Sequence, residues 1–187
     1  MRTKEPNQAE KMLTAAAKLF SGQRFHKVRM EDIAAAAEVG KGTLYRYFQD
    51  KEDLYCALLA RASDEIQARI ADAVERAGTC RAKLTAFIAS GIDYFDEQPH
   101  VAMLIQRVEV LQGTDSPWQP AREAFLRLTL EIFAKAAEKG EFTVRHPETS
   151  AHMLIGGTRS VVLFGDQPRR PGLAASIVDD FLDGAAR

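Results

Sequence analysis

Apolar residues recur at helical spacing along almost the whole of this chain of 187 residues. The clearest run follows Asp50, where six apolar residues from Leu54 to Val74 are separated by intervals of four. Few segments show the period-two alternation or the clusters of β-branched residues that strands prefer. The sequence therefore predicts an all-α fold of about nine helices.

Turn residues divide this pattern into helices. Gly22, Gly78 and Gly113 are expected to end helices, and Asp50 is expected to cap the long one, with Asp53 completing a weak capping box. Loops are expected at 113–120 and 166–172. The predicted helices span about 8–21, 30–37, 41–48, 51–77, 81–98, 101–112, 120–139, 147–165 and 173–185.

Charge is unevenly distributed along the chain. Residues 1–51 hold ten Lys/Arg and six Asp/Glu, a net charge of +4, whereas the remainder holds fifteen and twenty, a net charge of −5. A basic N-terminal part on an acidic body favours an N-terminal contact with a polyanion. The alternative is chance asymmetry, because the numbers are small.

Several classes of protein are disfavoured. The sequence has no run of eighteen apolar residues and no apolar signal-peptide core at its start, so we expect no membrane span. The two cysteines, Cys56 and Cys80, lack metal-site spacing and suit a cytoplasmic protein with reduced thiols. No catalytic motif, phosphate-binding loop or metal-ligand spacing occurs, so we expect neither an enzyme nor a cofactor or metal.

Residues 29–54 contain two short helical patterns joined by a tight turn at Val39–Gly40. This is the layout of a helix-turn-helix, in which the second helix enters a DNA groove. In that second helix, Leu44 and Phe48 are expected to face the core. The residues expected to face outward are Lys41, Gly42, Thr43, Tyr45 and Arg46.

These outward residues suit contacts with DNA. Lys41 and Arg46 can donate to guanine or phosphate, and Gly42 lets the backbone approach closely. The hydroxyls of Thr43, Tyr45 and Tyr47 can donate to phosphate. Lys51 begins the long helix, where free backbone N–H groups also attract phosphate. The alternatives are a helix-turn-helix used only for packing and, for Lys51, a solvated helix end.

Residues 8–55 resemble the DNA-binding domain of TetR-family transcriptional regulators. The resemblance implies a helix-turn-helix domain over 1–50 and a helical effector-binding and dimerisation domain over 51–187. It also implies a ligand-responsive repressor that a small molecule releases from a near-palindromic DNA operator. The alternative is a helical ligand-binding protein that no longer binds DNA. The matching residues are Ala16, Phe20, Phe25, Val28, Ile33, Ala34, Ala37, Val39, residues 41–48, Lys51 and Leu54.

Two positions depart from that family pattern. Arg29 stands where Ser or Thr usually precedes the second helix, and Gly40 stands where a capping residue often precedes the third. Gly is a tolerable N-cap and Arg a poor one. We hypothesise that Arg29 replaces the lost cap with a phosphate contact.

The last two helices carry broad apolar surfaces, which favours a homodimer built on a four-helix interface. Twofold symmetry would place two recognition helices about 34–36 Å apart. The alternative is that these helices complete the core of a monomer. The predicted interface residues are Met153, Gly156, Gly157, Val161, Phe164, Ile177, Val178, Phe181 and Leu182.

An effector pocket is expected among the helices between residues 51 and 165, lined by apolar residues with a few polar groups. The sequence does not identify the effector. Each aromatic candidate has the alternative of an ordinary core position, and Arg107 that of a structural salt bridge. The candidates are Phe87, Tyr94, Phe95, Met103, Arg107, Trp118, Phe125, Thr129 and His152.

Overall fold

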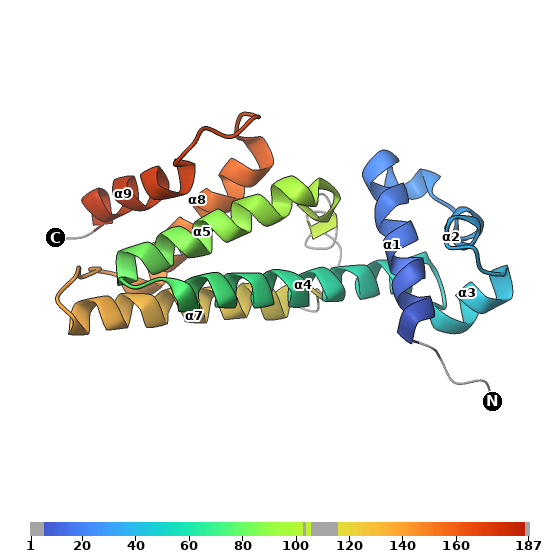
Figure 1. Ribbon diagram of the computed structural model, residues 1–187, viewed down its shortest axis with the longest axis horizontal. Helices are drawn as coiled ribbons and strands as arrows, with labels where there is room; N and C mark the ends of the chain where they lie inside the picture. Colours follow the sequence, from blue (N-terminus) through green and yellow to red (C-terminus); the bar gives the residue numbers. More distant parts are fainter. Residues whose placement is uncertain (1–5, 103, 106–115, 186–187) are drawn as a thin grey trace. The chain divides into compact units, whose positions relative to one another are not determined.

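The structure, a computed structural model, describes residues 6–102, 104–105 and 116–185. Every regular element in these residues is a helix, as the sequence predicts (Figure 1). The chain forms two compact units. The first consists of Met1–Ala62 with Pro99–Pro117, and the second of Ser63–Gln98 with Trp118–Arg187.

The first unit contains α1 (Pro6–Gly22), the short 3₁₀ helix η1 (Phe25–Lys27), α2 (Met30–Ala36), α3 (Lys41–Tyr47) and the beginning of α4 (Lys51–Arg76). An aromatic cluster joins these elements. Phe25 stacks on Phe20 with ring centroids 5.2 Å apart, and Tyr55 meets both rings edge-on. The Tyr55 hydroxyl donates to the Leu104 carbonyl, so this core includes residues distant in the sequence.

Asp50 caps the start of α4, as its sequence position predicts. Its Oδ1 atom accepts a hydrogen bond of 2.8 Å from the Asp53 backbone N–H. The Asp53 carboxylate in turn accepts one of 2.9 Å from the backbone N–H of Gln49. Two backbone donors at the helix start are thereby satisfied, which fixes where α4 begins after α3.

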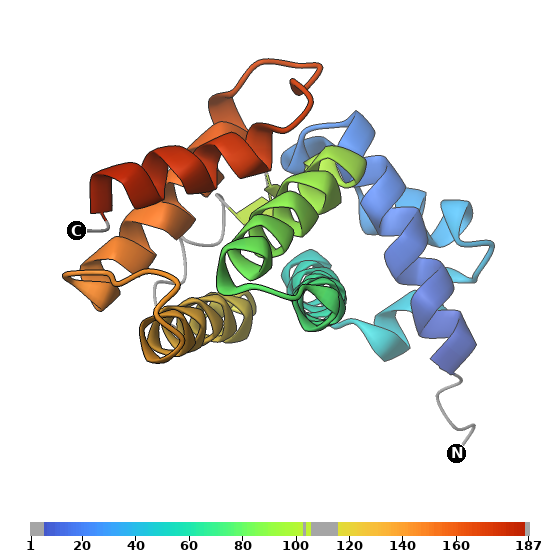
Figure 2. The same cartoon turned by 60° about the vertical axis from the view of Figure 1, so that its left-hand side comes forward.

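The second unit contains the rest of α4 with α5 (Cys80–Glu97), α7 (Gln119–Glu138), α8 (Pro147–Phe164) and α9 (Leu173–Ala185). In this unit α9 packs along α5, and α7 packs along α8 (Figure 2). Thr79 caps α5 by accepting a 3.1 Å hydrogen bond from the Ala82 N–H. The Glu141 carboxylate accepts a second one of 2.6 Å from the Cys80 N–H.

The loop between α8 and α9 is held by one arginine. The Arg169 guanidinium donates to the Val161 and Val162 carbonyls at 2.8 and 3.0 Å, which caps the end of α8. It also pairs with the Asp96 carboxylate of α5 at 3.1 Å. A Cβ atom at Gly165 would lie 2.5 Å from the Val161 oxygen and 2.7 Å from the guanidinium, so this arrangement requires glycine there.

Most predicted helix limits agree with the structure to within about two residues. α4 ends at Arg76 rather than beside Gly78, and α7 begins at Gln119, one residue before Pro120. The predicted helix over 101–112 is described at 101–102 and 104–105, which are helical, and otherwise lies outside the described residues. None of the helices in the described part of the chain has the length and hydrophobicity that a bilayer crossing needs.

Candidate nucleic-acid interface

The turn between α2 and α3 is built around Glu38. This residue has a φ of 56°, in the left-handed region, and is the only non-glycine residue with positive φ among those described. Gly40, which the sequence pattern places in the turn, is extended at φ −67° and ψ 146° and forms the N-cap of α3. The turn therefore does not depend on glycine, and a side chain at Gly40 would only meet Thr43 Oγ1 at 3.9 Å.

α3 is divided into a buried and an exposed side. Leu44 and Phe48 are 0 % and 7 % exposed, which confirms the inward face predicted for them. Lys41, Gly42, Tyr45 and Arg46 are exposed, while Thr43 and Tyr47 are half-buried. A helix with this division can present donors to a DNA groove while its other side stays in the core.

Lys41 carries an ion pair across the helix-turn-helix. Its Nζ atom lies 2.6 Å from the carboxylate of Glu31, in the first turn of α2. Hydrogen bonding to Glu31 raises the pKa of Lys41, and hydrogen bonding to Lys41 lowers the pKa of Glu31. Sequence reasoning missed Glu31, because the pair joins two helices and no local spacing signals it.

The tyrosines of α3 lie beside cations. The Lys41 ammonium is 5.8 Å from the Tyr45 ring centroid, and the Arg46 guanidinium is 5.7 Å from that of Tyr47. The Tyr47 hydroxyl donates to Gln8 of α1 at 3.3 Å. Tyr47 therefore joins α3 to α1.

The N-terminus of α2 is capped by the side chain of Asp32 and not by that of Arg29. Asp32 Oδ2 accepts a 3.1 Å hydrogen bond from the Arg29 backbone N–H, and the Arg29 side chain makes no capping bond. A guanidinium has no acceptor with which to cap a helix start. The exposed Arg29 side chain is consistent with the hypothesis of a phosphate contact.

Lys51 is tied to the loop around η1. Its ammonium donates to the carbonyls of Phe25 and Val28 at 2.9 and 3.0 Å, and it lies 4.3 Å from the Phe25 ring centroid. These bonds use two of the three donors of an ammonium group. Lys51 thus holds the start of α4 against the segment before α2, a role that the sequence pattern did not indicate.

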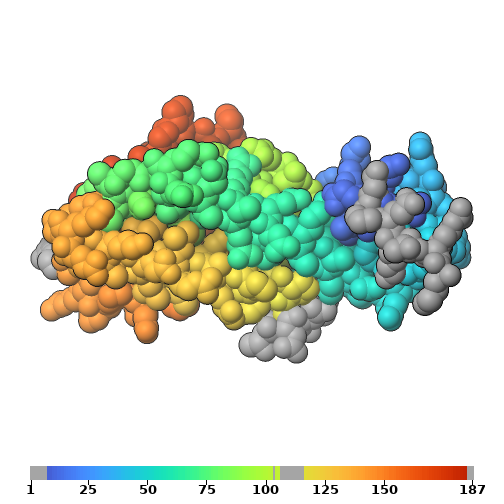
Figure 3. All heavy atoms as spheres, turned by 60° about the horizontal axis from the view of Figure 1, so that its bottom comes forward, coloured from blue at the N-terminus to red at the C-terminus, as the bar shows by residue number. Residues whose placement is uncertain are grey.

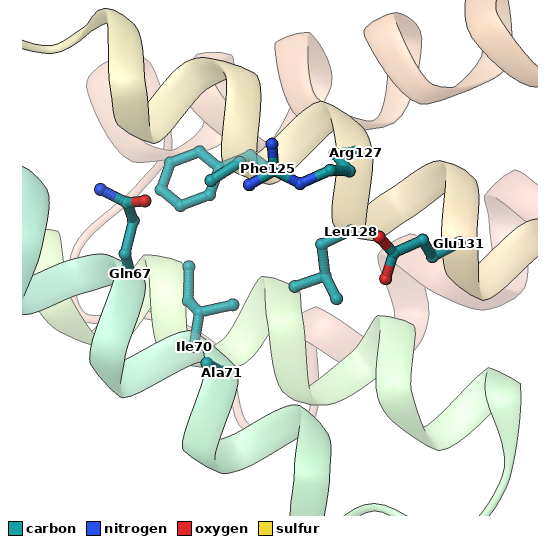
Figure 4. Close-up of a pocket in the computed structure, with 8 residues that line it drawn as sticks. Gln67, Ile70, Ala71, Phe125, Arg127, Leu128 and Glu131 are labelled. Atoms are coloured by element: carbon teal, nitrogen blue, oxygen red, sulfur yellow. The ribbon is translucent and has the colours of Figure 1, made fainter.

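A cavity of about 250 Å³ lies in the second unit, between α4 and α7, which run side by side there (Figure 3). Ile70, Phe125 and Leu128 point into it, and the polar side chains of Gln67, Arg127 and Glu131 surround it (Figure 4). Its remaining lining residues are Ala71 and Ala124. Of the predicted effector-pocket residues that the structure describes, only Phe125 lines this cavity.

Most of the other predicted pocket aromatics form a cluster with Phe125. Ring contacts run in sequence from Tyr94 through Phe95, Trp118 and Phe125 to Phe87, with centroids 5.5, 6.0, 6.4 and 5.7 Å apart. These rings pack against one another, as in the alternative interpretation of core positions. The Tyr94 hydroxyl also donates to Glu65 at 3.2 Å.

Three other pocket candidates need separate comment. Thr129 is fully buried, and its hydroxyl donates to the Phe125 carbonyl of its own helix at 2.8 Å. His152 is exposed on α8 and does not line the cavity between α4 and α7. Met103 and Arg107 lie outside the described residues.

The predicted interface residues fall into three groups by exposure. Met153, Gly156, Gly157 and Phe164 are exposed on α8, and Val161, Ile177 and Phe181 are half-buried. Val178 and Leu182 are 0 % and 2 % exposed, so they belong to the core of the protomer rather than to its outer surface. Phe181 also stacks on Phe133, with ring centroids 5.9 Å apart.

Within the described residues, no cluster of His, Cys, Asp or Glu is suited to holding a metal ion.

Sequence comparison gives relatives for both parts of the chain. Residues 12–58 match the sequence model of the bacterial regulatory proteins of the tetR family. The fatty acid metabolism regulator protein of Bacillus subtilis is 24% identical over 161 residues, which cover 84% of this chain and 82% of that protein.

Solved structures share the fold over nearly the whole chain. The transcriptional regulator FadR from Bacillus subtilis, in complex with stearoyl-CoA, superimposes with a TM-score of 0.73 at 20% identity, covering 93% of this chain and 95% of FadR. AibR, in complex with isovaleryl coenzyme A and operator DNA, also gives 0.73 at 20% identity, covering 95% and 97%. With its helix-turn-helix and helical second unit, the chain belongs to the TetR family of transcriptional regulators.

Proposed function

We propose that this regulator is a homodimeric repressor that binds a near-palindromic DNA operator through α3 and leaves it on binding an acyl-CoA. The observation that carries the DNA-binding part is the exposed row on α3, which joins Lys41, Tyr45 and Arg46 over a buried inner face. Cationic and hydroxyl donors on one side of a short helix suit the acceptors of the major groove.

The proposed contacts fall into two sets. Lys41, Gly42, Thr43, Tyr45 and Arg46 face base edges. Contacts to phosphate would come from Arg29, from Tyr47 and from the remaining donor of Lys51. Phosphate contacts position the protein on DNA, and base contacts carry sequence preference.

DNA binding is tested with the full-length protein and a fluorescent random-sequence duplex at about 50 and 200 mM salt. We expect binding that weakens steeply with salt, because cationic side chains displace counterions from phosphates. Arg46→Ala should weaken binding, while Lys135→Ala, which removes an exposed cation from α7, should not. Absence of wild-type binding at the lower salt would contradict the proposal and favour a ligand-binding protein without DNA.

The homodimer is proposed from the outer face of α8. Met153 and Phe164 are 68 % and 77 % exposed, the two largest values among the exposed large hydrophobic residues described. Gly156 and Gly157 lie between them on the same helix and allow a second helix to approach closely. Exposed large apolar side chains beside small residues suit a helix-to-helix interface.

The effector is proposed from the cavity between α4 and α7 and from the ligands of two similar proteins. FadR and AibR were solved with stearoyl-CoA and isovaleryl coenzyme A. Here the cavity has an apolar floor beside the Arg127 cation, which suits an acyl chain attached to an anionic group. Its volume of about 250 Å³ is below the 300–1,000 Å³ usual for ligand sites, which favours a short acyl chain over a long one.

Effector action is tested by adding isovaleryl-CoA, stearoyl-CoA or free coenzyme A to the complex of the protein with a duplex selected for binding. We expect isovaleryl-CoA to dissociate the complex most effectively and free coenzyme A least. Ala71→Trp, which fills the cavity, should abolish the response, and Ala134→Trp on the exposed side of α7 should not. A complex that all three compounds leave intact would contradict the acyl-CoA proposal. A reporter gene behind the selected duplex distinguishes repression from activation.

A further inference from the structure

Glu31 places a carboxylate on the surface that α3 presents. It lies 2.6 Å from the Lys41 ammonium, and the two side chains are 52 % and 62 % exposed. Tyr45, one turn further along α3, lies beside the same ammonium at 5.8 Å. The carboxylate of Glu31, the ammonium of Lys41 and the ring of Tyr45 thus form one exposed cluster that includes residues of both α2 and α3.

The neighbouring acid has a different role. Asp32 accepts the Arg29 backbone N–H and so belongs to the start of α2. Glu31 instead reaches across to the first residue of α3. An exposed ion pair of this kind adds little to stability, so stabilisation of the fold is a poor reason for an acid on a surface that meets a polyanion.

The pair changes what Lys41 can bind. A phosphate that approaches the ammonium also approaches the Glu31 carboxylate, and the two negative charges repel each other. A base edge such as guanine O6 and N7 is uncharged. Because an ammonium has three donors, Lys41 can donate to that edge while it keeps its bond to Glu31. The pair therefore penalises phosphate contacts more than base contacts.

We infer that Glu31 is a specificity-determining residue, which positions Lys41 to read a base edge and prevents it from serving as a non-specific phosphate anchor. This inference rests on the proposed binding of DNA through α3. It assigns to an acidic residue of α2 a share in the sequence preference of the recognition helix.

The test compares four full-length proteins: the wild type, Glu31→Gln, Lys41→Met and the double variant. Each is titrated with a random-sequence duplex and with the duplex that the wild type enriches from a random library. Glu31→Gln should bind the random duplex roughly two- to fivefold more tightly, and its preference for the enriched duplex should fall by a similar factor. Its salt dependence should steepen by about one unit of slope, because Lys41 becomes a phosphate contact.

Two controls make the result specific to the pair. In the Lys41→Met background, Glu31→Gln should change neither affinity nor slope. Glu38→Gln removes an equal charge from an exposed residue of the same motif and should leave the preference for the enriched duplex intact. Thermal unfolding should show that all the variants remain folded.

The outcomes separate this inference from the proposed function. If the wild type binds no duplex at low salt, the DNA-binding proposal itself fails. The assignment of Glu31 is overturned if the wild type binds while Glu31→Gln keeps its slope and preference. It is also overturned if the effect persists without Lys41 or is reproduced by Glu38→Gln, because the acid would then act only through bulk repulsion.

Discussion

Lys51 is a positively charged residue whose side chain also links two segments of the first unit. Its ammonium satisfies the Phe25 and Val28 carbonyls, which lie 26 and 23 residues earlier in the chain. Lys51→Met should therefore lower the free energy of unfolding by about 2 kcal/mol, since hydrogen bonds from charged donors are the stronger ones. Urea unfolding followed by circular dichroism measures this.

The matched control for Lys51 is Lys27→Met, which removes an exposed cation from the same unit. It should leave the midpoint of unfolding within experimental error. If the two variants unfold at the same midpoint, the hydrogen bonds of Lys51 do not stabilise the first unit. A loss of DNA binding by Lys51 variants has to be interpreted with this in mind, because a displaced helix-turn-helix and a lost phosphate contact both weaken binding.

His100 makes the stability of the first unit depend on pH. It is 6 % exposed, and burial, with the nearby Arg61 charge as a second cause, lowers its pKa from the ordinary 6.5. As pH falls below 6.5, the unfolded chain gains a proton that the folded chain resists, so the free energy of unfolding decreases. The decrease is at most about 1.4 kcal/mol per pH unit.

His100→Gln keeps a polar side chain but removes this titration. Between pH 7.5 and about 5, its unfolding free energy should fall less than that of the wild type, as measured by urea titrations at each pH. Equal pH dependence in the two proteins would show that other groups account for the effect.

At the scale of helices, the join between α8 and α9 depends on Gly165. Gly165→Ala places a methyl group 2.5 Å from the Val161 carbonyl oxygen and 2.7 Å from the Arg169 guanidinium. We expect a loss of about 1–3 kcal/mol in unfolding free energy, because the Arg169 clamp must shift. Gly184→Ala should instead stabilise α9 by up to about 1 kcal/mol, because the added methyl group would meet no atom within 4 Å beyond its own turn of helix. Thermal unfolding compares them.

Helices and their caps could be predicted from the sequence because their causes are local. The Asp50 cap and the inward Leu44 and Phe48 follow from residues within one or two turns, and the structure contains all three. The partners of Lys51 and Lys41 could not be predicted, because each bond joins separate elements. The boundary between domains at residues 50 and 51 stays a prediction.

Apolar periodicity also does not distinguish which part of a wide apolar face meets a partner. α9 carries apolar residues over a broad arc, of which Val178 and Leu182 point into the protomer while Ile177 remains half-buried. The same limit applies to α8, where His152 lies on the exposed side of the helix although its apolar neighbours Ala151 and Leu154 are buried. Only the packing of neighbouring helices separates these cases.

At the scale of the whole molecule, the proposed dimer makes a direct prediction about mass. Phe164→Glu places a charge on the most exposed of the large hydrophobic residues of α8, and should convert the dimer into monomers because an unpaired charge is costly at an apolar interface. Light scattering after size-exclusion chromatography measures the mass. Thr143→Glu, at an exposed position before α8, should remain dimeric.

Loss of the dimer should also weaken operator binding, since a monomer presents one recognition helix to a two-part site. If the Phe164→Glu protein remains dimeric, the dimer interface does not involve the outer face of α8. A wild type that is monomeric at micromolar concentration would contradict the homodimer itself.

The Tyr55 hydrogen bond to Leu104 has a consequence for how this protein can be recombined. Val101, Leu104 and Ile105 are buried, and they belong to the first unit although 36 residues of the second unit precede them in the gene. A chimaera with a single crossover after residue 62 would therefore contain residues 1–62 of the first unit without the later segment that completes their core. Exchanging the first unit between such regulators requires three crossovers, after residues 62, 98 and 117, so that the Leu104 segment is transferred together with Tyr55.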